Sequence, residues 1–134
     1  MTAFKLLRPE EVIARWDDLA KLLDQAVQMG NGELHVEDIL KLVLSGRMYV
    51  FASDDFAVTV EFVTYPQKTT MVVGFGAGKV PERGDVADVL TEFARRAGAS
   101  SIQTYCRNPA MIRYYRRWFQ LEPTYTVLEK SLCA

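Results

Sequence analysis

The amino-acid sequence predicts one mixed α/β (α+β) domain, in which an antiparallel sheet in the first half continues into alternating strands and helices. Two observations lead to this fold class. Three strand-like runs follow one another through short connections in the middle of the chain, and short connections require antiparallel neighbours. Stretches with apolar residues every three to four positions flank these runs and predict amphipathic helices. The expected order is β-α-α-β-β-β-α-β-α-β, and the last strand could be a pair.

Composition agrees with a single globular domain over residues 1–134. Apolar residues make up 49% of the chain and charged residues 25%, which are not the proportions of a disordered chain. The net charge of −1 gives no whole-domain attraction to nucleic acid or to an anionic membrane surface. The chain also lacks an apolar run long enough to span a membrane and a signal-peptide pattern at its start. We therefore expect a cytoplasmic protein without a membrane partner.

The cysteines and the histidine predict no metal site. Cys106 and Cys133 have no metal-ligand spacing, and His35 stands in no partner motif. Two reduced thiols are favoured over a disulfide, since paired cysteines are rare in a reducing interior.

In the first half, the apolar spacing after Pro9 predicts a helix that ends at Gly30-Asn31-Gly32, and Gly46 is expected to end the second helix. The expected elements are a strand at 4–7, helices around 12–27 and 36–44, and strands at 48–53, 56–64 and 69–75.

In the second half, Asp85 is expected to cap a third helix that Gly98 ends, and Asn108 to cap a fourth with Pro109 in its first turn. The expected elements are a helix around 86–97, a strand at 101–106, a helix carrying Met111, Ile112, Tyr115 and Phe119 inward, and a final strand or strand pair at 121–128.

The element order resembles that of the GNAT (Gcn5-related N-acetyltransferase) fold superfamily over essentially the whole chain. The fourth helix carries Ala-Met-Ile-Arg-Tyr-Tyr-Arg-Arg-Trp-Phe, where the family has Ala-Ile-x-Leu-Tyr-x-x-x-Gly-Phe after an asparagine. The match lies at Asn108, Ala110, Tyr114 and Phe119. It fails at Trp118, where the family has glycine.

The resemblance implies two catalytic residues. Tyr114 stands where the family has a general acid that protonates the leaving coenzyme A thiolate, and a phenol with a pKa of about 10 suits that thiolate. An equally good interpretation of Tyr114 is a core residue with a wet hydroxyl. Glu61, on a meander strand opposite the larger side chains of Val60 and Phe62, stands where the family often has the base for the amine. A solvent-facing strand residue is the favoured alternative for Glu61.

The cofactor loop is degenerate. The family has Arg/Gln-x-x-Gly-x-Gly/Ala before the third helix, because pyrophosphate binds backbone N–H groups at a helix N-terminus and needs small residues there. Here the loop includes Arg83 and Gly84, but Val86 and Asp88 replace small residues. The carboxylates of Asp85 and Asp88 would also compete with an anionic ligand for the helix dipole. A plain helix start is favoured, and the sequence predicts weak or absent binding of acetyl-CoA.

The glycine-rich run from Gly74 to Gly78 matches neither a Walker A loop nor a dinucleotide fingerprint. It is the end of a strand, and the resemblance implies that strands splay here to admit the acyl-pantetheine arm. In that case an N–H group near Gly74 to Gly76 would polarise the acyl carbonyl.

A local basic patch surrounds the fourth helix, with Arg107, Arg113, Arg116 and Arg117. A solvated face is the default interpretation, and binding of phosphate or of an acidic protein surface is the alternative.

Two functions remain open at this point. One is an acyl-CoA-dependent N-acyltransferase with acetyl-CoA as donor, an amine as acceptor and no metal. The other is a catalytically silent scaffold that binds a protein partner. Small proteins of this appearance also resemble those that tailed bacteriophages encode, some of them virion-associated.

Overall fold

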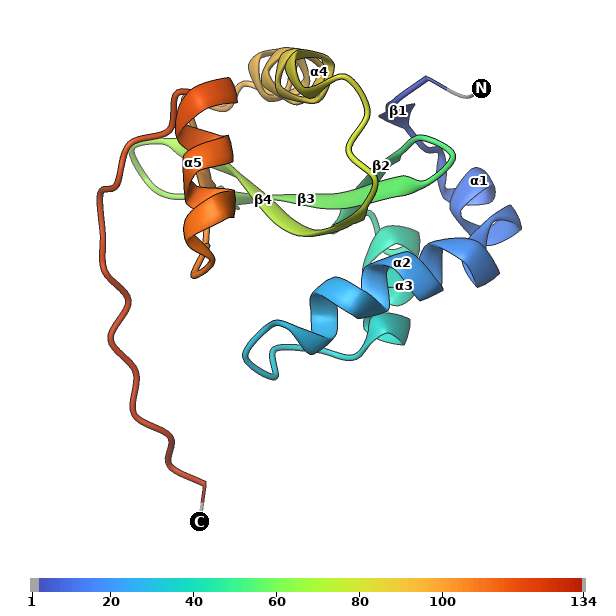
Figure 1. The fold of residues 1–134 in the computed structure, drawn as a ribbon, viewed down its shortest axis with the longest axis horizontal. Helices are drawn as coiled ribbons and strands as arrows, with labels where there is room; N and C mark the ends of the chain where they lie inside the picture. Colours follow the sequence, from blue (N-terminus) through green and yellow to red (C-terminus); the bar gives the residue numbers. More distant parts are fainter. Residues whose placement is uncertain (1–2, 134) are drawn as a thin grey trace.

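The computed structural model describes residues 3–133 and confirms a mixed α/β fold (Figure 1). Its elements are β1 (Lys5–Leu6), α1 (Pro9–Ala14), α2 (Trp16–Gln28), α3 (Val36–Leu44), β2 (Tyr49–Ala52), β3 (Phe56–Thr64), β4 (Thr69–Gly78), α4 (Arg83–Arg96), β5 (Ser101–Thr104) and α5 (Pro109–Trp118).

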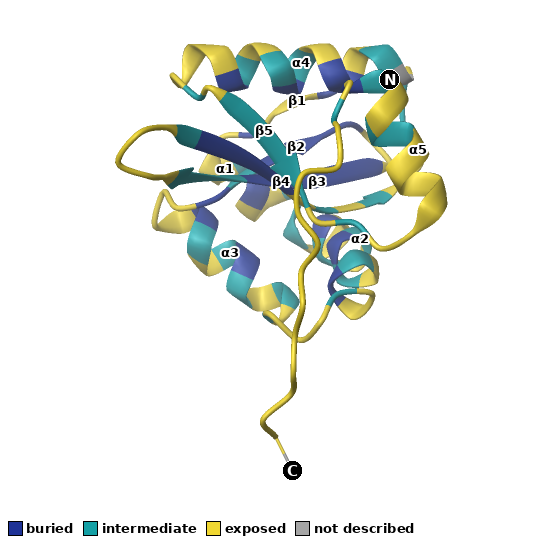
Figure 2. Ribbon diagram, turned by 90° about the vertical axis from the view of Figure 1, so that its left-hand side faces the viewer, coloured by how far each residue is buried: buried dark blue, intermediate teal, exposed yellow. Residues whose placement is uncertain are grey.

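The sheet has five strands in sequence order, β1-β2-β3-β4-β5. The first four are antiparallel neighbours, and β5 joins β4 in parallel. Helix α4 covers one face of the sheet, and α1, α2 and α3 cover the other (Figures 1 and 2). The meander predicted from short connections and the mixed sheet are therefore confirmed.

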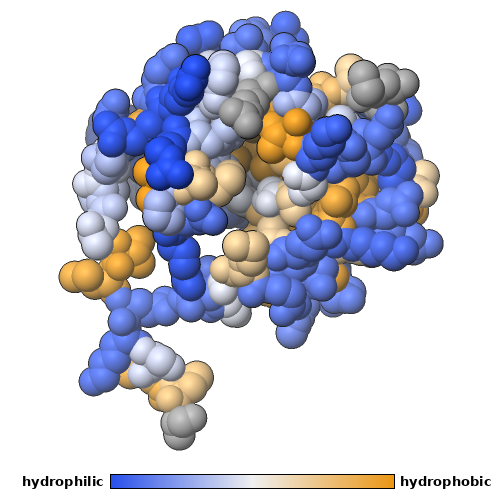
Figure 3. Space-filling model, viewed as in Figure 1, coloured by the Kyte–Doolittle hydropathy of each residue, from blue (hydrophilic) through white to orange (hydrophobic). Residues whose placement is uncertain are grey.

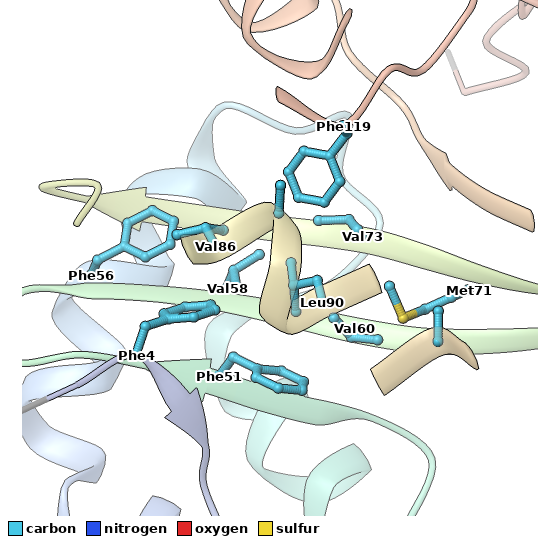
Figure 4. Packing of buried hydrophobic residues seen from close by; sticks show 12 residues of the cluster. Phe4, Phe51, Phe56, Val58, Val60, Met71, Val73, Val86, Leu90 and Phe119 are labelled. Carbon is cyan, nitrogen blue, oxygen red and sulfur yellow. The ribbon is translucent and has the colours of Figure 1, made fainter. Parts of the chain in front are cut away.

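Each face of the sheet has its own apolar core. Figure 4 shows the core beneath α4 and α5, where Phe51, Val60, Leu90 and Phe119 are among the buried residues. The opposite core joins α1, α2 and α3 to the sheet and includes the fully buried Leu19. Burying side chains on both faces stabilises the sheet and places α4 and α5 on the same side.

The helix expected after Pro9 is two helices that meet at Arg15. The backbone of Arg15 leaves helical geometry with φ −105° and ψ 12°. Its guanidinium Nη2 donates a hydrogen bond of 2.8 Å to the carbonyl oxygen of Ser53, at the end of β2. This contact with a residue distant in sequence accompanies the break, which the local spacing of apolar residues could not indicate.

Helix α4 begins two residues before the expected cap. Glu82 occupies the N-cap position without a side-chain cap, and the N–H of Asp85 donates to the carbonyl oxygen of Glu82 at 3.0 Å. The prediction that Asp85 caps this helix is wrong, because Asp85 lies inside the first turn. There its carboxylate still favours the positive end of the helix dipole.

Helix α5 begins as predicted, since Asn108 Oδ1 accepts a hydrogen bond of 2.8 Å from the N–H of Ala110. At its C-terminal end the N–H groups of Phe119 and Leu121 both donate to the carbonyl oxygen of Tyr115, at 3.1 and 3.2 Å. Gln120 holds the left-handed position of this turn with φ 54°. Glycine usually takes this position.

The final strand predicted at 121–128 is absent. Residues 121–133 have no regular secondary structure and leave the body of the domain after α5 (Figure 1). A strand needs a neighbour for its backbone hydrogen bonds, and none of the described strands supplies one to this segment.

The inward face predicted for α5 is partly wrong. Phe119 is buried at 9% exposure, and Tyr115 is half-buried. Met111 and Ile112 are instead 39% and 36% exposed. No strand from 121–128 covers the first turns of α5, so their apolar side chains stay at the surface.

We expect Phe119→Ala to lower the free energy of unfolding by ~3–5 kcal/mol, because it removes a ring from the core between α5 and β4. Urea unfolding measures the change. Met111→Ala on the same helix is the control, and its effect should be much smaller since Met111 is exposed. Equal urea midpoints for wild type and Phe119→Ala would contradict this packing.

Candidate functional site

The candidate site lies where β4 and β5 part. The two strands pair from Thr70↔Ser101 to Val73↔Thr104, and β4 then continues to Gly78. Beyond Val73, none of the described strands pairs with this side of β4. The pairing of β4 with β5 thus ends at the glycine-rich run, where the GNAT resemblance implied that the strands splay.

Thr104 fixes the point at which the strands part. Its hydroxyl donates a hydrogen bond of 2.9 Å to the carbonyl oxygen of Val73. Tyr115 of α5 also bonds to the Thr104 side chain, and this bond partly opposes the rise in the Tyr115 pKa caused by burial. Burial is the larger effect and raises the pKa of Tyr115 to about 12. Tyr115 therefore anchors α5 at the fork as a neutral phenol.

A β-bulge in β4 lies directly after this point. Val60 pairs with Val73 and Val58 with Gly76, so Gly74 and Phe75 together face the single residue Thr59. The buried hydroxyl of Thr59 accepts a hydrogen bond of 2.9 Å from the N–H of Phe75. The bulge thereby turns the β4 backbone at the place where β5 leaves it.

Two glycines of this run are required because other parts of the chain leave no room for a side chain. A Cβ at Gly74 would lie 2.7 Å from Thr59 Oγ1. Gly78 has φ +107°, and a Cβ there would lie 2.1 Å from the carbonyl oxygen of Asp55. At Gly76 the nearest atom, Val58 Cγ2, would be 3.3 Å away, a tight contact. The proposed roles of Gly74 and Gly76 toward a carbonyl stay predictions, and the Phe75 N–H is already bonded.

A groove of about 1030 Å³ lies between α5 and the two residues that follow β4, Lys79 and Val80. Four of its lining side chains are cationic, namely Lys79, Arg113, Arg116 and Arg117. Figure 3 shows strongly hydrophilic side chains gathered over α5. The remaining lining residues are Val80, Ala110, Met111, Tyr114, Trp118 and Glu122.

Two contacts orient the arginines of this groove. The Arg117 guanidinium carbon lies 5.2 Å from the centre of the Trp118 ring, a cation–π contact. Arg116 Nη2 lies 3.5 Å from Glu122 Oε2, on two exposed side chains. The sequence predicted the arginine face but missed Lys79 and Trp118 as its neighbours. The lysine that follows the glycine run was the available signal.

Tyr114 lies in the wall of the groove. Its ring contacts Tyr115 and Phe119, with centroids 5.4 and 6.1 Å apart. Its hydroxyl oxygen is shielded from solvent, so the wet hydroxyl of the alternative interpretation is wrong. The structure thus places Tyr114 beside the arginines, and its proton-donor role stays a prediction.

Glu61 does not line the groove beside α5. It is half-buried in a pocket of about 320 Å³ that Leu42, Arg47, Tyr49 and Phe62 also line, near the end of α3. Its side chain alternates with Val60 and Phe62, which pack in the core beneath α4. The structure therefore does not bring Glu61 and Tyr114 into one pocket.

The first turn of α4 is more open than the sequence suggested. Val86 is buried at 3% exposure and points toward Phe56 in the core (Figure 4), so the obstruction expected from Val86 is wrong. A Cβ added at Gly84 would meet nothing within 4 Å. The side chain of Arg83 lies outside the described residues.

The carboxylates of this helix stay outside the groove. Asp85 and Asp88 are both exposed, and neither lines it. Repulsion of an anion in the groove is therefore weaker than their sequence positions implied, since exposed charges are screened by water and salt.

No family model and no curated protein matches the chain, whereas solved structures do. An aminoglycoside acetyltransferase from an uncultured soil metagenomic sample, in complex with sisomicin, matches with a TM-score of 0.71 and 14% identity, over 98% of this chain and 96% of its own. A possible acetyltransferase from Clostridium difficile gives 0.68 and 12%, over 100% and 99%. The ribosomal-protein-alanine N-acetyltransferase from Brucella melitensis biovar Abortus gives 0.68 and 15%, over 97% and 99%.

The chain has the GNAT fold. The likeness spans nearly the full length of both partners; two of these structures are described as acetyltransferases and one as a possible acetyltransferase. At these identities it establishes the fold, and the bulge and fork of β4 in this chain lie at the position that the GNAT resemblance implied. The resemblance to phage-encoded proteins stays a prediction.

Among residues 3–133, no helix is long and apolar enough to cross a membrane. The same residues contain no group of three or more His, Cys, Asp or Glu side chains placed to hold a metal ion.

We expect Gly74→Ala and Gly84→Ala to change stability in opposite directions. The new methyl group at position 74 would clash with Thr59 Oγ1 and lower the free energy of unfolding by ~1–3 kcal/mol. At position 84 the space is open, and alanine in a helix should raise stability by up to about 1 kcal/mol. Urea unfolding compares both variants with wild type, and stabilisation by Gly74→Ala would refute the bulge geometry.

The raised pKa of Tyr115, about 12 against 10.0, predicts a pH dependence of stability. The folded state disfavours the phenolate, so the contribution is complete below pH 10.0 and is lost as pH rises toward about 12. The loss for this one group should reach roughly 2–3 kcal/mol. Wild type should therefore lose more stability between about pH 9 and 11.5 than Tyr115→Phe, measured by urea unfolding. Parallel curves would show that Tyr115 ionises freely.

Proposed function

We propose that this chain is an acyl-CoA-dependent N-acyltransferase that binds its cofactor in the groove between β4 and α5. The observation that carries the proposal is the cationic lining of this groove, with Lys79 and three arginines, beside α5 in a chain with the GNAT fold. Two acetyltransferases and one possible acetyltransferase match nearly the whole chain and support this reaction class.

The residues of the groove fit an anionic, elongated ligand. Coenzyme A carries several phosphate charges, and arginine and lysine are the side chains that best hold phosphate. The exposed carboxylates of Asp85 and Asp88 do not line the groove, and the open space at Gly84 leaves the backbone of the first α4 turn accessible. In this proposal, the arginines of α5 compensate for the degenerate loop that includes Arg83 and Gly84, and Asn108 keeps α5 in place by capping it.

Bound acyl-CoA would supply an activated thioester carbonyl carbon. N–H groups at Gly74 or Gly76 would donate to the carbonyl oxygen, because the bulge and the missing β5 neighbour free this part of the β4 backbone. Tyr114 borders the groove, and its shielded hydroxyl would have to become accessible to the groove before it could give its proton to the departing thiolate sulfur.

Glu61 is the proposed base for the amine. Its pocket at the end of α3 is separate from the groove, so the acceptor would approach from the α3 side of the sheet and the cofactor from the α5 side.

A second candidate function is a scaffold without acyl transfer. Trp118 stands where GNAT proteins have glycine and packs with Arg117 along the groove. An indole with a guanidinium over its face suits an acidic protein partner as well as a phosphate. A virion-associated role of such a scaffold in a bacteriophage belongs to this alternative.

Titration with acetyl-CoA separates the two functions. We expect acetyl-CoA to raise the melting temperature of the wild type, because a ligand at 100 times its dissociation constant stabilises the folded state by about 2.7 kcal/mol. Arg116→Glu with Arg117→Glu should remove most of this shift by reversing two charges of the groove. The matched control reverses Arg95 and Arg96, at the far end of α4, and should keep the shift.

The chemistry is tested by Tyr114→Phe. This variant should bind acetyl-CoA with an unchanged thermal shift and transfer the acetyl group to a panel of amines at least tenfold more slowly, as loss of a general acid implies. No shift at millimolar acetyl-CoA, or an equal shift in the Arg116→Glu, Arg117→Glu variant, would contradict the proposed site and leave the scaffold function.

A further inference from the structure

A small pocket at the C-terminal end of α3 is lined by one cationic and one anionic side chain, Arg47 and Glu61. We propose that this pocket binds a free α-amino acid, with Glu61 at its ammonium group and Arg47 at its carboxylate. The proposal names the chemical class of the acceptor amine. That role of the ligand rests on the proposed function, whereas the binding of the ligand does not.

The end of α3 fixes the position of Arg47. The N–H of Gly46 donates to the carbonyl oxygen of Val43 at 3.0 Å, and the N–H of Arg47 donates to that of Leu42 at 2.9 Å. These two bonds form a Schellman motif, and Gly46 takes its left-handed position with φ 74°. Glycine adopts this conformation without strain, so the turn holds the Arg47 backbone at the rim of the pocket.

The sheet supplies the opposite charge. Glu61 lies on β3, one residue beyond the Tyr49↔Val60 pair that ends the ladder between β2 and β3. Its neighbours Val60 and Phe62 pack in the core beneath α4, so its own side chain belongs to the α3 face of the sheet, where it is half-buried. Within residues 3–133, neither Glu61 nor Arg47 forms an ion pair or a side-chain hydrogen bond. A partly desolvated carboxylate without a partner favours the binding of a cation.

The size of the pocket suits a ligand that carries its two charges close together. The volume of about 320 Å³ equals that of a sphere about 8–9 Å across. In an α-amino acid, bond lengths of about 1.5 Å place the ammonium nitrogen about 3 Å from the carboxylate oxygens. Charge-assisted hydrogen bonds of about 2.8 Å at each end give a total span of about 8–9 Å. A polyamine lacks the carboxylate, and its further ammonium groups would be repelled by Arg47.

The rest of the lining agrees with this ligand. The C-terminal end of α3 carries a partial negative charge, which favours an ammonium group there. Leu42, Tyr49 and Phe62 also line the pocket, and the rings of Tyr49 and Phe62 hold each other edge to face with centroids 5.9 Å apart. These residues are suited to contact an apolar side chain. The ligand is therefore a small hydrophobic α-amino acid such as leucine.

The first test is the binding of L-leucine to the wild type in the absence of acyl-CoA, measured by NMR titration at neutral pH. Leucinamide lacks the carboxylate and N-acetylleucine lacks the ammonium group, so each should bind at least tenfold more weakly than leucine. Spermidine should bind no better than leucinamide. Equal affinities for leucine and leucinamide, or no binding at tens of millimolar leucine, would overturn the proposal. This comparison uses the wild type alone, so it does not depend on how any variant folds.

The second test assigns each charge to its end of the ligand. Arg47→Gln should bind leucine and leucinamide equally, because the partner of the carboxylate is gone. Glu61→Gln should bind leucine and N-acetylleucine equally for the corresponding reason. Lys41→Gln is the matched control, since Lys41 is on the same helix and does not line the pocket, and it should bind leucine as wild type does. A preference for leucine over leucinamide that survives in Arg47→Gln would contradict the assignment.

Acetyl transfer from acetyl-CoA to leucine separates this inference from the proposed function. Binding of leucine without transfer would support the amino-acid pocket and contradict the proposed acyltransferase. Transfer to other amines by a protein that does not bind leucine would support the acyltransferase and overturn the amino-acid pocket.

Discussion

The hydroxyl of Thr59 is the contact on which the shape of the site depends. It occupies the space that a side chain at Gly74 would fill and accepts the N–H of Phe75, so two residues of β4 fit opposite one residue of β3. The resulting bulge turns β4 just where Thr104 ends its pairing with β5. The groove lies beyond this point, between α5 and the two residues that follow β4.

The sequence predicted the sheet, four of the helices and the cap of α5, because each of these rests on local spacing or on adjacent residues. The predictions were wrong where the local structure depends on residues that are distant in the sequence. The break at Arg15 accompanies a bond to Ser53, and the strand predicted at 121–128 has the right composition but no neighbour on the sheet. A strand forms only beside another strand, so the composition of one segment cannot predict it without knowledge of its neighbour.

In the candidate site, too, features within one element could be predicted and contacts between elements could not. Tyr114 and the arginine face could be predicted because they share one helix, whereas Lys79 joins them only through the fold. The glycine run suggested a ligand, but Gly74 and Gly78 are explained by close approach of Thr59 and Asp55. Val86 suggested an obstruction, but helix phase turns it into the core. A residue type at a motif position therefore says little until the direction of its side chain is known.

Glu122 is the acidic residue among the cationic side chains of the groove. It lines the groove and forms an ion pair with Arg116 at 3.5 Å. An exposed ion pair of this kind contributes little to stability, so Arg116 can exchange it for a phosphate contact at small cost. In the proposed complex, the groove would then offer all four of its positive charges to the cofactor.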